Sequence, residues 1–127
     1  MKTYHTVYGN VMDLQIKVFR WPDTGNYVIV ITHGRVDIEG FKEIFRKVAP
    51  LTESLRDYKV VIDLQDATCR LEPADIHGFV TTLSPDLWPN NKVALVSAPE
   101  SEQYDQLFVL STCLSDRGFK IAVFYDT

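Results

Sequence analysis

Three short apolar runs constrain the fold of this chain more than any other feature. Lys59–Leu64 is nearly continuous in apolar residues, which is typical of a strand buried on both faces of a parallel sheet. Two similar runs follow at Lys92–Ser97 and Phe119–Tyr125, and helical segments at about 73–83 and 101–117 separate the three runs. Because crossovers of this length join parallel strands, the runs predict parallel βα units.

The N-terminal part of the chain predicts a different kind of pairing. Residues 14–20 alternate apolar with polar side chains, which is the period of a half-buried strand. Turn residues at 21–26 and a β-branched run at 27–32 follow, and together they indicate an antiparallel hairpin. We therefore predict a single α/β domain over residues 1–127, in which a mixed sheet combines this N-terminal hairpin with the parallel βα units in a layered fold.

Local signals mark the helix between the hairpin and the first parallel strand. Over residues 38–48, apolar side chains recur three and four apart with charged side chains between them, as in an amphipathic helix. Asp37 is expected to cap this helix, and Pro50 is expected to end or kink it. Gly34 is expected to supply an unusual backbone conformation, and Gly118 to close the last helix.

Length, charge and cysteine content narrow the class of protein. The 127 residues suit one domain, and the net charge of −4 argues against nucleic acid or an anionic membrane as the main partner. The longest apolar stretch, Tyr27–Ile31, is too short to cross a bilayer, and residues 1–10 lack the apolar centre of a signal peptide. Cys69 and Cys113 show no metal-ligand or redox spacing. We expect a cytoplasmic protein with reduced thiols, no membrane insertion, no metal and no cofactor.

Three stretches of the sequence resemble STAS domains, the family of anti-sigma-factor antagonists. Thr32–Gly40 resembles the strand-to-helix junction of these domains, Lys59–Asp66 their central strand, and Arg117–Phe124 their last strand. With the order of elements, the resemblance covers about residues 14–127. The chain is most similar to a divergent bacterial branch of STAS-like proteins whose function is not settled.

This resemblance implies a module that binds other proteins without catalysing a reaction. The family often carries a phosphorylated Ser at the start of the helix after the central strand, but here Leu71–Ala74 holds that place without a hydroxyl group. We therefore expect no Ser phospho-switch. Members of this branch usually continue into a further helix after the last strand, whereas this sequence stops at Thr127. Other helices or a second chain are then expected to cover the last strand.

The resulting prediction is a non-enzymatic regulatory or scaffolding domain that acts through protein–protein contacts. Another protein is the expected partner, and a homodimer is kept as an option. The contacts are expected around the loops Gly34–Gly40 and Gln65–Asp75. The candidate partner-binding residues are Arg35, Asp37, Asp66, Thr68, Cys69, Glu72 and Asp75.

A small-molecule or lipid carrier is the alternative function. It requires an apolar cavity between helices and sheet, and four phenylalanines are candidates to line it. The competing interpretation is that the same side chains fill the core. These residues are Phe41, Phe45, Phe79 and Phe108.

An enzymatic function comes last. It would rest on Asp63 and Asp66 after the central strand, Cys69 with a pKa lowered by its neighbour Arg70, and His77 as a general base. The simpler expectation is that Asp63 accepts backbone hydrogen bonds in its own loop and that His77 is a partly exposed helix residue.

Overall fold

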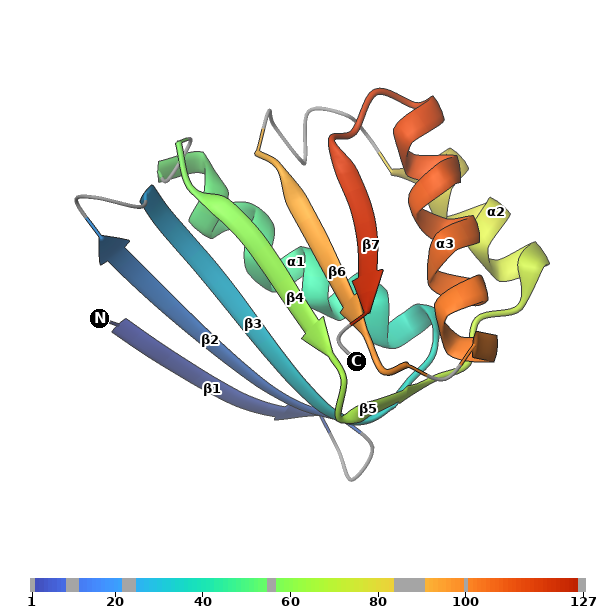
Figure 1. Cartoon of the computed structure of the whole chain (residues 1–127), viewed down its shortest axis with the longest axis horizontal. Helices are drawn as coiled ribbons and strands as arrows, with labels where there is room; N and C mark the ends of the chain where they lie inside the picture. The colour runs from blue at the N-terminus through green and yellow to red at the C-terminus, as the bar shows by residue number, and fades with distance from the viewer. Residues whose placement is uncertain are drawn as a thin grey trace.

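The computed structural model describes residues 2–8, 12–21, 25–54, 57–83, 91–99 and 101–125. These residues form a mixed sheet in the order β1-β2-β3-β4-β6-β7, with β5 beside β3 (Figure 1). β1, β2 and β3 pair antiparallel, whereas β3, β4, β6 and β7 pair parallel. The strands are β1 Lys2–Tyr8, β2 Met12–Trp21, β3 Gly25–Val36, β4 Lys59–Leu64, β5 Ala67–Cys69, β6 Val93–Ser97 and β7 Ile121–Tyr125.

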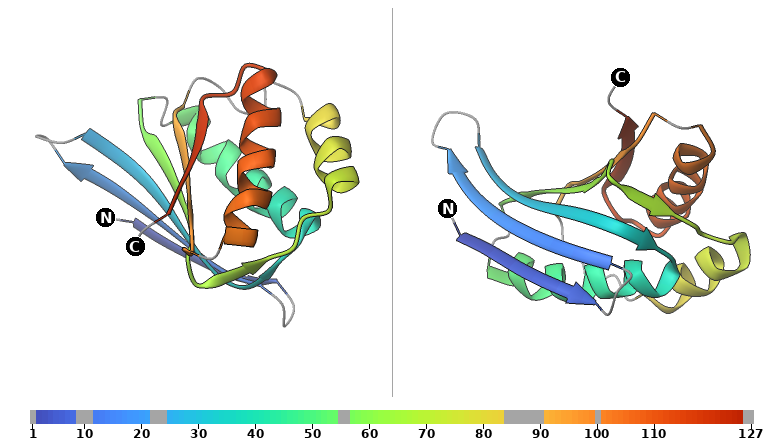
Figure 2. Two further views of the ribbon diagram at one scale, coloured as in Figure 1. Left: turned by 45° about the vertical axis from the view of Figure 1, so that its right-hand side comes forward. Right: turned by 90° about the horizontal axis from the view of Figure 1, so that it is seen from below.

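Three helices in the described ranges lie on one side of this sheet (Figure 2). They are α1 Ile38–Ser54, α2 Pro73–Thr82 and α3 Ser101–Asp116. The ring of Phe45 on α1 contacts that of Phe79 on α2, with centroids 5.3 Å apart. The predicted α/β fold is therefore confirmed: a mixed sheet with an N-terminal antiparallel pair, β2 and β3, is followed by parallel βα units.

Alternation along the strands gives the sheet two different faces. Side chains that point toward the helices are buried, as at Val30, Ile62 and Leu95. Their neighbours along each strand point the other way and are only half-buried or exposed, as at Ile31 and Phe124. We call the second side the open face. Each large apolar side chain fully buried on the helix side contributes about 1.5–3 kcal/mol, so this side holds the core together.

Two strands lack a signal in the sequence pattern. β1 lies at the edge of the sheet and pairs along its whole length with β2, from Lys2 opposite Val18 to Tyr8 opposite Met12. β5 contains three residues, which is too short for a period of two to show. The segment around Cys69 was expected to be a loop, and that expectation is wrong. β3 extends past the end of β4, and its last residues pair with this segment as β5.

Pro50 was expected to end or kink the helix, with a further turn possible at residues 51–55, and the structure shows that it does not end the helix. α1 runs through Pro50 to Ser54. Apolar burial holds it on both sides of the proline, since Val48 is fully buried before it and Leu51 packs against the core after it. Thr52 is buried as well, and its hydroxyl donates a hydrogen bond to the Ala49 carbonyl at 2.8 Å. Packing of an amphipathic face outweighs the backbone hydrogen bond that a proline removes.

The positive-φ glycines behave as predicted. Gly34 has a φ of 91° near the end of β3, and Gly118 has a φ of 97° after α3. The Gly118 N–H donates to the Ser115 carbonyl at 3.0 Å and the Phe119 N–H to the Leu114 carbonyl at 3.1 Å. These bonds satisfy carbonyls at the end of the helix.

Among the described residues, no helix is both long enough and apolar enough to cross a membrane.

Candidate functional site

The candidate site lies where β3 extends beyond the end of β4. Gly34, Arg35 and Val36 at the end of β3 pair in parallel with Ala67, Thr68 and Cys69 of β5, which sets Arg35 directly opposite Thr68. Ala67 and Cys69 are buried, whereas Arg35 and Thr68 are exposed. Because side chains alternate along a strand, Arg35 and Thr68 both point to the open side.

An extra residue between β4 and β5 shapes this edge. Three residues separate Asp63 from Ala67, but only two separate their partners Ile31 and Gly34. One additional residue in one strand is a β-bulge, a feature that redirects nearby side chains. The Gln65 N–H donates to Asp63 Oδ1 at 3.0 Å inside the bulge, so the prediction that Asp63 accepts a backbone hydrogen bond in its loop is confirmed.

The bulge also brings Asp66 next to His33. Asp66 Oδ2 lies 3.7 Å from His33 Nε2, and both side chains are more than half exposed. The contact joins β3 to the β4–β5 connection. No partner for His33 was predicted, because the pairing depends on the bulge and on the β3–β5 register, which have no local signal.

A hollow of about 420 Å³ lies beside the paired residues. Its lining includes the two cations Arg35 and Arg70, the hydroxyl-bearing Thr68, and Val36 with Asp37 at the start of α1. The Arg70 N–H donates to the Val36 carbonyl at 2.9 Å, which continues the β3–β5 pairing by one more bond. Two guanidinium groups and a hydroxyl around one hollow form a set of donors suited to a carboxylate or phosphate group.

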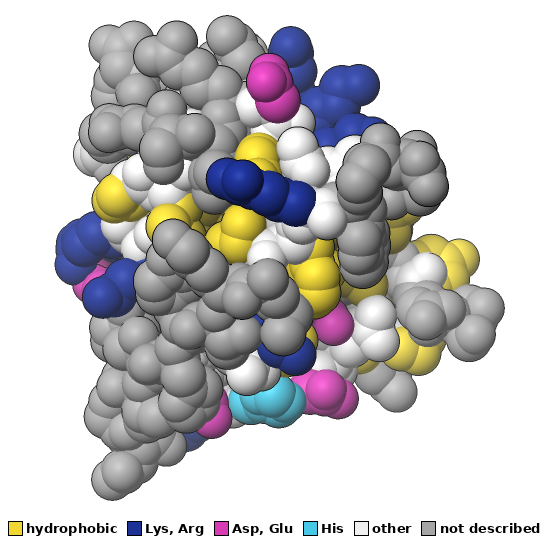
Figure 3. Space-filling model, turned by 90° about the vertical axis from the view of Figure 1, so that its left-hand side faces the viewer, with side chains coloured by type: hydrophobic (Ala, Val, Ile, Leu, Met, Phe, Trp, Pro, Cys, Tyr) yellow, Lys and Arg dark blue, Asp and Glu magenta, His cyan; other side chains and the backbone are white. Residues whose placement is uncertain are grey.

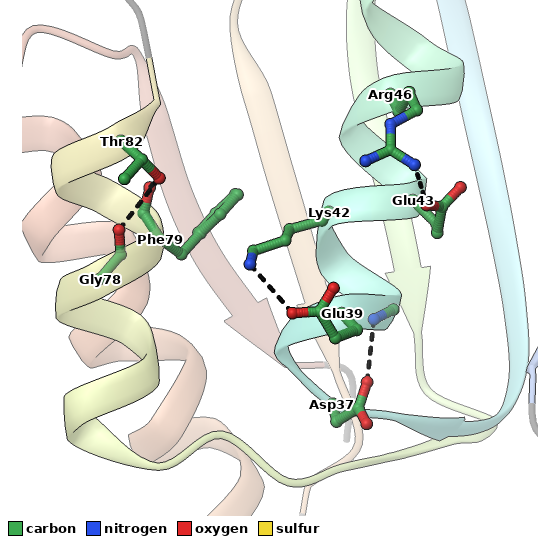
Figure 4. Close-up of polar contacts among 9 residues, drawn as sticks. Asp37, Glu39, Lys42, Glu43, Arg46, Gly78, Phe79 and Thr82 are labelled. Carbon is green, nitrogen blue, oxygen red and sulfur yellow. Dashed lines mark hydrogen bonds and ion pairs between the residues drawn. The ribbon is translucent and has the colours of Figure 1, made fainter.

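Asp37 has a structural role at this site. Its Oδ1 accepts a hydrogen bond from the Gly40 N–H at 2.9 Å, so Asp37 caps α1 as predicted (Figure 4). The cap fixes the direction in which α1 leaves β3. Pairs three residues apart follow on the exposed side of the helix, Glu39 with Lys42 at 3.0 Å and Glu43 with Arg46.

Two glutamines of α3 bind the backbone of β5 and of the segment that follows it. The Cys69 N–H donates to Gln103 Oε1 at 3.1 Å, and the Leu71 N–H donates to Gln106 Oε1 at 2.8 Å. Gln103 Nε2 also donates to the Leu64 carbonyl at 3.2 Å. The sequence predicted neither role, because it shows only two glutamines three positions apart on a predicted helix, and their half-burial appears only in the structure.

Cys69 is placed differently from the prediction. Its side chain points into the core and is 6% exposed. Burial raises the pKa of the Cys69 thiol from 9.0 to about 12. The alternative in which Arg70 lowers this pKa is wrong, because removal of the thiolate from water dominates. The raised pKa agrees with the simpler expectation that a single cysteine without a histidine partner is inert. The Cys69 side chain is also buried away from any partner at this surface.

Glu72 and Asp75 are exposed in and before the first turn of α2. Glu72 is the N-cap residue but makes no side-chain capping hydrogen bond, and Pro73 follows it at the first helical position. Neither acid is among the residues that line the hollow. Of the predicted contact residues, the structure therefore gathers Arg35, Asp37 and Thr68, and it places Asp66 beside them.

The four phenylalanines do not lie together. Phe41, Phe45 and Phe79 are buried, and their rings follow one another at 6.4 Å and 5.3 Å between centroids. These three side chains fill the core between α1, α2 and the sheet. Phe108 is 52% exposed on α3, so the four do not line one cavity. The competing interpretation, that they fill the core, is confirmed for the other three and is wrong for Phe108.

The residues considered for catalysis are also distributed over different places. Asp63 is engaged by its own loop and Asp66 lies beside His33. The Cys69 thiol is in the core, and His77 is exposed on α2. Within the described ranges, no group of three or more His, Cys, Asp or Glu side chains is arranged to hold a metal ion.

Comparisons with known proteins add a similarity of fold. No family model and no curated protein matches this chain. It is similar to the crystal structure of an uncharacterised protein of the DUF3478 family, with a SpoIIAA-like fold, from Shewanella loihica PV-4. The two are 16% identical with a TM-score of 0.49, and the match covers 95% of this chain and 93% of that one. The likeness is one of fold alone.

Proposed function

We propose that this chain is a non-enzymatic regulatory or scaffolding domain that binds another protein through the hollow beside Arg35. The observation that carries the proposal is that Arg35, Thr68 and Arg70 line one hollow of about 420 Å³. The segments that supply them are more than thirty residues apart in the sequence and are joined by the β3–β5 pairing.

The chemistry of the hollow favours an acidic group of the partner. Each guanidinium presents several N–H donors in a fixed plane and binds carboxylates in pairs of hydrogen bonds. The chain as a whole carries a net charge of −4, whereas the hollow is lined by two arginines and one carboxylate, that of Asp37. A partner with Asp, Glu or a phosphorylated side chain on an extended segment fits this pattern.

The exposure of these side chains favours a reversible complex. Exposed charge pairs contribute about 0.2–1 kcal/mol each, which is too little for tight binding by the arginines alone. Glu72 and Asp75, exposed at the start of α2, are proposed as further contacts of the same partner. Weak, salt-sensitive association is what a regulatory contact requires.

Site-directed photo-crosslinking in cells tests this proposal even while the partner is unidentified. A benzoylphenylalanine at position 68 is expected to give a defined adduct with one protein, and Arg35→Glu is expected to reduce its yield. The same group at position 116, exposed at the end of α3 and outside both the hollow and the start of α2, is the matched control. Equal adducts from both positions would contradict the proposal.

A titration with an acidic peptide tests the chemistry separately. A glutamate-rich peptide added to isotope-labelled protein is expected to shift the amide signals of Arg35, Thr68 and Arg70. Arg70→Glu is expected to abolish these shifts, whereas Arg117→Glu, which reverses an exposed charge after α3, is expected to leave them unchanged. Shifts elsewhere on the domain would move the binding site away from the hollow.

A further inference from the structure

The open face of the sheet carries two apolar rows. Across the parallel strands, Ile29, Val61, Ala94 and Ala122 lie in one row of the register. The next row contains Ile31, Asp63, Val96 and Phe124. The first-row residues Ile29, Val61 and Ala94 are half-buried, Ala122 is exposed, and Phe124 is 55% exposed. The described helices all lie on the other side of the sheet (Figure 2).

One end of this face is basic. Three lysines lie side by side in the row before Val61: Lys59, Lys92 and Lys120. Two backbone hydrogen bonds align them, one from the Val60 N–H to the Lys92 carbonyl at 2.9 Å and one from the Val93 N–H to the Lys120 carbonyl at 2.8 Å. All three lysines are exposed. Lys59 Nζ lies 5.8 Å from the centre of the Tyr27 ring, which places it on the open face.

The other end is acidic. Asp63 lies in the second apolar row, and Asp13 lies one row further, opposite His33. In the view of Figure 3, Lys and Arg side chains lie at the top and also on the left and in the middle, and a histidine lies near the bottom between acidic side chains. Hydrophobic side chains show between the two ends. Along β4 the face therefore runs from Lys59 through Val61 to Asp63. On β2, Lys17 lies opposite Ile29 at the side of the first apolar row.

We propose that a second copy of this chain covers the open face, with the two sheets stacked around a two-fold axis near Val61. Lys59 and Asp63 lie two residues on either side of Val61, about 7 Å each way along the strand. Rotation about that axis sets the lysine row of each copy against the Asp63 row of the other. Sheets stack face to face about 10 Å apart with roughly parallel or antiparallel strands, so the apolar rows meet between the charged ends.

Self-complementarity favours a second copy over other occupants. A two-fold interface requires that one patch match itself, and a face that is basic at one end and acidic at the other meets this condition. An anionic lipid surface would match the lysines but not Asp63, Asp13 or the net charge of −4. The hollow at Arg35 lies about 20 Å along β3 from Ile29, beyond the acidic end, so this proposal is independent of the proposed function.

The first test is the molar mass of the whole chain across a concentration series, measured by sedimentation. We expect a concentration-dependent dimer that weakens as salt rises. Val61→Asp is expected to raise the dissociation constant at least about 100-fold, because it sets two like charges at the axis. Val109→Asp, on the exposed side of α3, is the matched control and is expected to leave the dimer intact.

Charge exchange tests the orientation of the two copies. Asp63→Asn keeps an acceptor for the Gln65 N–H, so it is expected to weaken the dimer and its salt dependence without unfolding the bulge. Lys92→Glu is expected to weaken the dimer about 10-fold, and adding Asp63→Lys to it is expected to restore most of the loss. Thermal unfolding of each variant shows that the domain remains folded.

Three results would overturn the proposal. One is a wild-type chain that stays monomeric at all concentrations up to about 200 μM, which would place the dissociation constant of any dimer above this range. Another is a dimer that Val61→Asp and Lys92→Glu leave unchanged, which would assign dimerisation to a different surface. The third is a monomer that binds vesicles of anionic lipid through Val61 and the lysines, which would assign the open face to a membrane.

Discussion

Gln103 on α3 ties the backbone of β4 to that of β5. Its Oε1 accepts the Cys69 N–H at 3.1 Å, and its Nε2 donates to the Leu64 carbonyl at 3.2 Å. The two backbone groups lie on either side of the bulge that carries Asp66. A half-buried amide therefore replaces the neighbouring strand that would otherwise satisfy these groups.

Loss of this amide is expected to destabilise the domain. Gln103→Ala leaves a backbone N–H and a carbonyl without their partner, which is expected to lower the free energy of unfolding by about 1–3 kcal/mol. Gln103→Glu keeps an acceptor for Cys69 but loses the donor to Leu64, so an intermediate loss is expected. Urea denaturation measures the free energy of unfolding of both variants. Gln65→Ala, at an exposed side chain, is the control, and equal stability of all three variants would contradict the role of Gln103.

The elements with a strong period were predictable from the sequence. The predicted strand Lys59–Leu64 matches β4 residue for residue. The expectation that it is buried on both faces is wrong, because Val61 and Asp63 on the open face are only half-buried. β5 was not predictable, because its three residues form a strand only where β3 continues beyond β4. α1 passes Pro50 for a similar reason, since Leu51 after the proline packs against the core of the whole domain.

The candidate site was predictable as two regions but not as an arrangement. Strand-to-helix junctions drew attention to Arg35 and Thr68, because ligands of open α/β sheets bind near the ends of parallel strands. The direct opposition of these two residues depends on the β3–β5 register. The direction of Cys69 depends on the same register, and this is why Cys69, a candidate partner-binding residue, points into the core instead.

The N-terminal ends of α1 and α2 differ in their capping. Asp37→Ala removes a cap bond of 2.9 Å and is expected to lower the free energy of unfolding by about 1 kcal/mol, with Asp37→Asn nearly neutral. Glu72 makes no cap bond, so Glu72→Ala is expected to leave the melting temperature nearly unchanged while it weakens partner binding. Differential scanning calorimetry compares the three. A large loss of stability for Glu72→Ala, with binding intact, would count against its contact role.

Two exposed glycines are expected to respond in opposite directions to alanine. Gly118 has a φ of 97°, so Gly118→Ala is expected to cost about 1–2 kcal/mol of stability from backbone strain alone. Gly78 lies inside α2, and a methyl group there meets nothing within 4 Å, so Gly78→Ala is expected to add about 0.5–1 kcal/mol. Thermal melts of the two variants measure both changes in stability, and the melting temperature is expected to fall for Gly118→Ala and to rise for Gly78→Ala. Equal shifts in the same direction would contradict this account.

Burial of Cys69 predicts a specific loss of stability at high pH. Below pH 9 the thiol is neutral in the folded and unfolded chains, so its ionisation contributes no difference. Between pH 9 and the raised pKa of about 12, the unfolded chain releases the proton and the folded chain keeps it. The unfolded chain then binds fewer protons, so stability falls with rising pH by at most about 1.4 kcal/mol per unit. Urea denaturation at pH 8, 9 and 10 is expected to show the gap between wild type and Cys69→Ala narrowing above pH 9. A gap that stays constant from pH 8 to pH 10 would show that the thiol ionises as easily in the folded chain as in the unfolded one.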